Sequence, residues 1–77
     1  MQHDVMPEFS GPPERVLTLL AALPDLRPFI RHVHWGDGEV SVQLHPMPRC
    51  AGARMAQRCF EDLRHRLPDT DIYVTLS

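Results

Sequence analysis

Long apolar runs are missing from this sequence. The longest one, VLTLLAALP, is interrupted by Thr18 and ends at Pro24. A helix that crosses a lipid bilayer needs roughly 20 consecutive, mostly apolar residues. We therefore do not expect this chain itself to act as a channel or a transporter.

Cysteine is scarce, because the chain contains only Cys50 and Cys59. Small secreted domains are usually held together by several disulfides and begin with an apolar signal segment, and neither pattern is present. We expect both cysteines to be free thiols. We expect the chain to be cytoplasmic, either alone or at the cytoplasmic face of a membrane protein.

The chain also lacks an excess of basic residues, since eight Lys and Arg residues stand against ten acidic ones and the formal charge is -2. Proteins that bind phosphate backbones need clustered positive charge, so nucleic acid is not an expected partner. The sequence has neither a Gly-rich phosphate loop nor a nucleophile elbow. We expect no enzymatic activity.

The 77 residues are enough for one small domain, which buries only roughly 60% of the surface that its unfolded chain exposes. Residues 1 to 10 show no periodicity, so we expect a flexible tail there and a single domain over residues 11 to 77. A first helix is predicted at about residues 12 to 23, capped by Ser10 and with prolines in its first turn. Its apolar residues form one stripe: Val16, Leu19, Leu20 and Leu23.

Two alternating segments flank Asp37-Gly38, a dipeptide that favours a tight hairpin turn. This turn predicts that the core side of the hairpin pairs Trp35 with Val40, Val33 with Val42, and Arg31 with Leu44. The other side then carries Ile30, His32 and His34 against His45, Gln43 and Ser41. We expect that second side to face away from the helices.

A second helix is predicted at about residues 52 to 67, where apolar residues again follow a helical spacing: Ala53, Ala56, Phe60, Leu63 and Leu67. The last segment, DIYVTLS, alternates apolar and polar residues as a strand does. A right-handed crossover would place it parallel to the second hairpin strand, with both helices on one face. The predicted fold class is α+β: an α-β-β-α-β chain with a three-stranded mixed sheet, half of a ferredoxin-like fold.

Three segments carry a family resemblance. ALPDLRPFIRHVHW enters the first strand through a proline-containing turn, VSVQLHP is an apolar strand that ends in histidine, and FEDLRHRLPDTDIYVTL joins a helix, a proline and a strand. Together they resemble the C-terminal cytoplasmic domain of cation diffusion facilitator metal transporters, over about residues 13 to 76. The resemblance implies a metallochaperone-like homodimer that regulates the efflux of divalent cations such as zinc, beside membrane-embedded segments outside this chain.

The resemblance covers the metal ligands only in part. Zinc-binding members of that family take histidines from four places, and only His45 matches one of them. The other three places hold Ile30, Ala53 and Thr75. The resemblance therefore implies that the usual binuclear zinc site is absent or rebuilt.

A rebuilt site would use His32, His34 and His45. His32 and His34 are two positions apart on a strand and point to one face, with His45 diagonally across the ladder from His32. Three imidazoles and a water can hold zinc, and other divalent transition metals are alternatives. No carboxylate is expected on this face to orient the rings. The alternative is that the histidines are solvated or lie in a dimer interface.

A second candidate metal site lies in HPMPRC, where His45, Met47 and Cys50 offer ligands for Cu(I). The alternative for Cys50 is a partly exposed thiol in a loop. Cys59 is expected to be a small core residue beside Phe60.

These patterns leave two functional classes open. The first is a cytoplasmic, metal-sensing regulatory domain similar to that of a zinc-type cation efflux transporter. The second is a metal-free interaction and dimerisation module of the same fold, and a small metal-binding chaperone is a further alternative. Each of the two classes predicts a homodimer, whose interface we expect to bury Ile30, Tyr73 and the stems of the arginines of the second helix.

Overall fold

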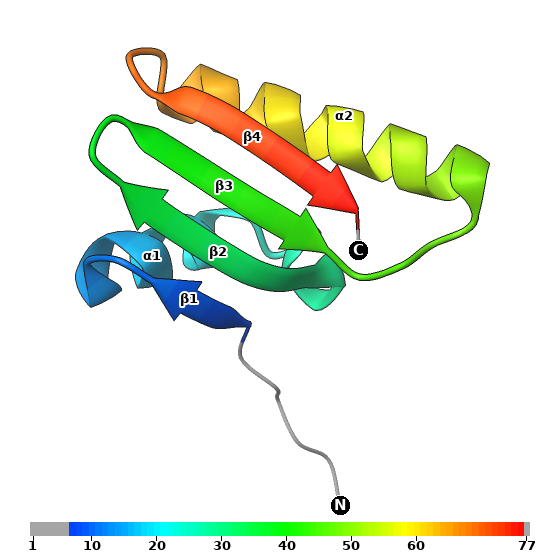
Figure 1. Ribbon diagram of the computed structural model, residues 1–77, viewed down its shortest axis with the longest axis horizontal. Coiled ribbons are helices and arrows are strands. Elements are labelled where there is room, and N and C mark those ends of the chain that lie inside the picture. The colour runs from blue at the N-terminus through cyan, green and yellow to red at the C-terminus, as the bar shows by residue number, and fades with distance from the viewer. Residues whose placement is uncertain (1–6, 77) are drawn as a thin grey trace, which may run out of the picture.

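The computed structural model describes residues 7 to 76 as a four-stranded sheet with helices packed on it. In chain order, its elements are β1 (Glu8–Ser10), α1 (Pro13–Ala22), a short 3-10 helix (Arg27–Phe29), β2 (Ile30–Gly36), β3 (Glu39–Leu44), α2 (Arg49–Arg66) and β4 (Asp71–Leu76). Figure 1 shows their arrangement. Within this part of the chain, no helix is both long and apolar enough to cross a membrane.

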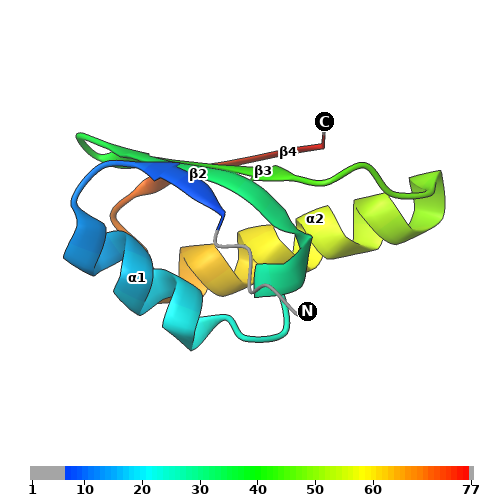
Figure 2. The ribbon, with the colours of Figure 1, turned by 90° about the horizontal axis from the view of Figure 1, so that it is seen from below.

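The strands lie in the sheet in their chain order. β1 is parallel to β2, β2 is antiparallel to β3, and β3 is parallel to β4. Both α-helices pack against one face of the sheet and leave the other face open (Figure 2). The fold is therefore α+β with its helices on one face, as the sequence predicts, and its β-α-β-β-α-β order is compatible with a ferredoxin-like arrangement.

The sheet has four strands and not the predicted three. The additional strand is β1, in which Phe9 lies opposite Val33 and packs against the core. A strand of three residues with a single inward side chain shows no recognisable alternation, so the sequence pattern predicts a tail there. Residues 8 to 10 belong to the domain, and residues 1 to 6 of the predicted tail lie outside the described residues.

The chain turns from β1 into α1 through glycine. Ser10 is the last residue of β1, and the helix has Pro12 at its N-cap without a side-chain hydrogen bond, so the predicted Ser10 cap is wrong. Gly11 has a φ of 127°, a conformation that side chains other than hydrogen disfavour. A Cβ at this position would lie 2.6 Å from the carbonyl oxygen of Trp35, so glycine permits the close approach of this turn to β2.

The two strand-helix-strand units have opposite hands. β3, α2 and β4 form the right-handed crossover that the sequence predicts and that almost all such units adopt. β1 and β2 run opposite to β3 and β4, yet α1 lies on the same face as α2 (Figures 1 and 2), so the unit of β1, α1 and β2 is left-handed. This uncommon hand brings both helices to one side of the sheet.

The core lies between the sheet and the helices. The predicted stripe of α1 is buried in full, and it meets the buried side of the hairpin: Val33, Val40, Val42 and Leu44. On α2 the buried residues are Gly52, Cys59 and Leu63, whereas Ala53 is exposed. The predicted stripe of α2 is therefore only partly right, and Phe60 is left half-buried at the side of the helix.

The β2–β3 hairpin has the predicted register near its turn. The observed pairs are Trp35 with Val40, His34 with Ser41, Val33 with Val42, and His32 with Gln43. The turn itself contains Gly38 with a φ of 73°, as an Asp-Gly hairpin turn requires.

A bulge changes the register at the far end of the hairpin. The pairing shifts between Ile30 and His32, so Ile30 and not Arg31 lies opposite Leu44. Ile30 is only 3% exposed, which corrects its predicted place on the open face. A bulge accommodates one extra residue, and here it brings an apolar side chain into the core while Arg31 stays at the surface.

Candidate functional site

The open face of the sheet holds the two histidines of β2. His32 lies between Glu8 of β1 and Gln43 of β3. His34 lies two residues further along β2, opposite Ser41 of β3. His32 is half-buried and His34 is exposed. The structure therefore brings these two predicted ligands to one face, as expected from their spacing.

Carboxylates lie beside both of these histidines, which the sequence does not predict. β1 places Glu8 directly opposite His32. Near the hairpin turn, Cγ of Glu39 and Nε2 of His34 each lie 3.4 Å from the point that a Cβ on Gly36 would occupy. A carboxylate can accept a hydrogen bond from either form of an imidazole, so groups that could orient the rings are present after all.

His45, the third predicted ligand, follows β3. Its backbone N–H donates a hydrogen bond to the carbonyl oxygen of Phe29, at 2.9 Å, and its exposed side chain borders a hollow of about 410 Å³. Within residues 7 to 76, no three His, Cys, Asp or Glu side chains form a group that could hold a metal ion. The three histidines therefore do not converge as they stand.

The hollow beside His45 is lined by both basic and acidic side chains. Arg27 and Arg31 line it together with Glu8. Both arginines also take part in interactions of their own. The lining therefore combines one carboxylate with two guanidinium groups that have partners.

The two cysteines are free, as predicted, and lie in different surroundings. Cys59 is fully buried, and its burial, together with the negative charge of Asp62, raises the pKa of its thiol from 9.0 to about 11. Cys50 is exposed in the first turn of α2, whereas Met47 packs against the core. The thiol and the thioether of the predicted Cu(I) site thus face different environments, and that site stays a prediction.

The outer edge of β4 has no strand beside it. Asp71 is the only charged residue of this strand and occupies its first position. Tyr73 is 51% exposed, and Ile72 and Val74 are half-buried on the helix side of the sheet. These three side chains and Phe60 of α2 border an open, mostly apolar hollow of about 450 Å³. An apolar surface thus runs along a free strand edge.

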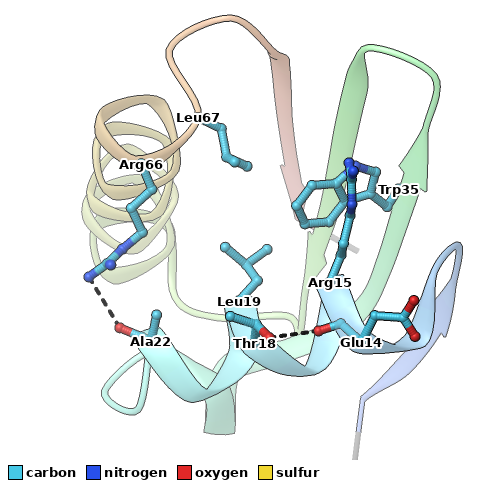
Figure 3. Close-up of a pocket in the computed structure, with 8 residues that line it drawn as sticks. All are labelled: Glu14, Arg15, Thr18, Leu19, Ala22, Trp35, Arg66 and Leu67. Carbon is cyan, nitrogen blue, oxygen red and sulfur yellow. Dashed lines mark hydrogen bonds between the residues drawn. The ribbon is translucent and has the colours of Figure 1, made fainter.

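A groove of about 370 Å³ lies between α1 and the end of α2. The side chains of Leu19 and Leu67 point into it, and the indole of Trp35 forms its wall on the side of the sheet (Figure 3). The guanidinium group of Arg15 lies over this indole, with its carbon 6.0 Å from the ring centre. Glu14 also lines the groove, so the groove is apolar inside and carries charges of both signs at its rim.

Arg66 closes the other end of this groove. Its Nη2 donates a hydrogen bond of 3.3 Å to the carbonyl oxygen of Ala22 (Figure 3). Ala22 is the last residue of α1, and carbonyl groups in the last turn of a helix lack partners within the helix. This contact joins the two helices across the groove.

Sequence reasoning does not identify the groove or the β4 edge as sites. Trp35 is correctly expected on the core side of the hairpin, but the sequence gives no sign that α1 and α2 leave part of its ring uncovered. The alternation that identifies β4 does contain a usable signal, since a strand with one terminal charge and no proline is poorly protected as an edge.

Comparison of the chain with protein-family models, with curated proteins and with solved structures finds no match.

Proposed function

We propose that this chain is an interaction module that forms a homodimer by pairing β4 with β4 of a second copy. The observation that carries the proposal is the free, nearly uncharged edge of β4 with apolar side chains on both sides. An exposed strand edge presents unpaired N–H and C=O groups and is a template for another strand.

The other edge of the sheet is protected. β1 has only three residues, begins with Glu8 and leads directly into Gly11 and two prolines. Short edge strands, charges and prolines all hinder the addition of a further strand. β4 is longer, with six residues, and contains no proline and only one charged residue, Asp71. It is therefore the edge on which a partner strand can extend the sheet.

A second copy of the chain fits this edge, because in a two-fold symmetric dimer each copy buries the same surface against the other. In an antiparallel β4 pair, directly opposed residues point to the same face. Ile72, Val74 and Leu76 would then meet their counterparts on the helix side, and Tyr73 would meet the partner strand on the open face. A chain this small buries little surface as a monomer and gains stability from the added burial.

The test is sedimentation equilibrium of the intact chain and of two lysine variants. Tyr73→Lys places a charge at the proposed interface, whereas Ser41→Lys places the same charge on the same face in β3, directly opposite Tyr73. We expect the wild type and Ser41→Lys to dimerise and Tyr73→Lys to stay monomeric. Dimerisation of all three proteins would contradict the β4 interface, and a monomeric wild type would contradict the module itself.

A zinc-responsive form of this dimer is the second candidate function. It is favoured by Glu8, which lies opposite His32 and borders the same hollow as His45. Carboxylates commonly orient zinc-binding imidazoles or join them as ligands. In this form the chain would regulate a divalent-cation transporter at the cytoplasmic side of membrane segments outside this chain, as the resemblance to cation diffusion facilitators suggests.

A further inference from the structure

We propose that the groove between α1 and α2 binds a small alkyl carboxylate, with its carboxylate on Arg15 and its alkyl chain against Leu19, Leu67 and Trp35. None of these residues belongs to β4, so this binding site does not depend on the proposed dimer. The proposal rests on the size, the lining and the charge of the groove.

The size and lining of the groove suit a small apolar molecule. Its volume of about 370 Å³ lies within the range of about 300–1,000 Å³ that is typical of ligand pockets. Leu19 is buried at its base, and Leu67 and Trp35 are half-buried beside it. Water in such a groove finds few hydrogen-bond partners, so its displacement by an alkyl chain is favourable.

Arg15 is the group at the rim of the groove that can bind an anion. Arg15 contacts the ring of Trp35, and across residues 7 to 76 its guanidinium group has no hydrogen bond or ion pair. A guanidinium group binds a carboxylate through two parallel N–H donors. The carboxylate of neighbouring Glu14 points away from Leu19 and Leu67 (Figure 3), and the Glu14 carbonyl oxygen accepts a hydrogen bond from the Thr18 hydroxyl, at 2.7 Å.

The ends of the groove limit the length of its occupant. Trp35 and Arg15 form one end, and the hydrogen bond from Arg66 to Ala22 closes the other. Because Arg66 already joins the two helices, Arg15 is the cation left for the ligand. The proposed occupant is therefore a short molecule that lies between these ends.

Trp35 provides a direct readout, since it is the only tryptophan of the chain. The intact protein would be titrated with octanoate and, separately, with octanamide, which has the same alkyl chain without the charge. We expect a saturable change in Trp35 fluorescence with octanoate, and an affinity for octanamide that is on the order of tenfold lower. Equal affinities for the two compounds, or no saturable change with octanoate, would overturn the proposal.

Arg15→Gln tests the anchor, with Arg64→Gln as its matched control. Arg64 also lies over an aromatic ring, with its guanidinium carbon 6.0 Å from the centre of the Phe60 ring, but it does not line the groove. By calorimetry we expect Arg15→Gln to raise the Kd of octanoate about tenfold and Arg64→Gln to leave it unchanged. An equal Kd in both variants would overturn the proposal. So would a Trp35 signal that follows protein concentration alone, because a second copy would then cover the groove.

Discussion

Ile30 lies opposite Leu44 across the β2–β3 ladder, and both side chains are buried. The bulge before His32 makes this pairing possible and leaves Arg31 exposed. Without the bulge, Arg31 would face Leu44 on the core side, where an uncompensated charge is strongly unfavourable. Ile30 therefore belongs to the core of the monomer and not to the dimer interface that the sequence suggests.

Replacement of Ile30 should consequently affect folding and not association. We expect Ile30→Ala to lower the free energy of unfolding by about 2–4 kcal/mol, the usual cost of removing a buried aliphatic side chain. Leu17→Ala, at a residue of α1 that is 45% exposed, should cost much less. Urea denaturation would measure both values. A small effect of Ile30→Ala on stability, together with a loss of dimer, would contradict the observed register.

Gly11 and Gly38 form a second matched pair. Both have positive φ angles, but a Cβ on Gly11 would clash with the backbone of Trp35 whereas a Cβ on Gly38 would meet nothing within 4 Å. We expect Gly38→Ala to cost about 1 kcal/mol from backbone strain alone. Gly11→Ala should cost about 3 kcal/mol, because overpacking adds to the strain. Chemical denaturation would measure the free energy of unfolding of both variants. Equal losses of stability would contradict the close packing of the turn after β1.

Cys59 should make stability depend on pH in the alkaline range. Its thiol ionises near 9.0 when unfolded and near 11 in the fold, so the native state holds the proton more tightly between these values. Stability should therefore fall as the pH rises through this window, by at most about 3 kcal/mol. Denaturant titrations at pH 8 to 11 should show a shallower fall for Cys59→Ala than for Cys50→Ala. Identical profiles for the two variants would mean that burial of Cys59 does not control its ionisation.

Zinc binding separates the two candidate functions. In the zinc-responsive form, we expect calorimetry of the reduced protein at neutral pH to show saturable binding that His32→Ala and Glu8→Gln weaken, because these residues face each other. Ser10→Ala, on the same face of β1, serves as the control. Absence of heat in the wild type would leave the metal-free interaction module.

The sequence predicts the helices and the three longer strands because each has a clear periodicity. Val16, Leu19 and Leu20 mark α1 by their helical spacing, and the Asp37-Gly38 turn determines the pairing near it. β1 escapes prediction because Phe9 is its only inward side chain.

The candidate sites depend on features that periodicity does not encode. The bulge near Arg31 leaves only one sign in the sequence, because Ile30 and Val33 are three positions apart whereas Val33 and Trp35 are two apart. Strict alternation counted back from the hairpin turn ignores this sign and places Arg31 on the core side. Glu8 lies opposite His32 only because its segment forms β1 and pairs with β2. The groove beside Trp35 depends on the placement of α1 and α2 on one face, which follows from an uncommon left-handed crossover.

Amide hydrogen exchange in β4, measured at low and at high protein concentration, tests the central proposal most directly. In the monomer, the outward N–H groups of this strand have no strand beside them and should exchange quickly. We expect their exchange to slow markedly as the concentration rises, while exchange in β1 does not change. A dimer that forms without added protection in Asp71–Leu76 would contradict the β4 interface.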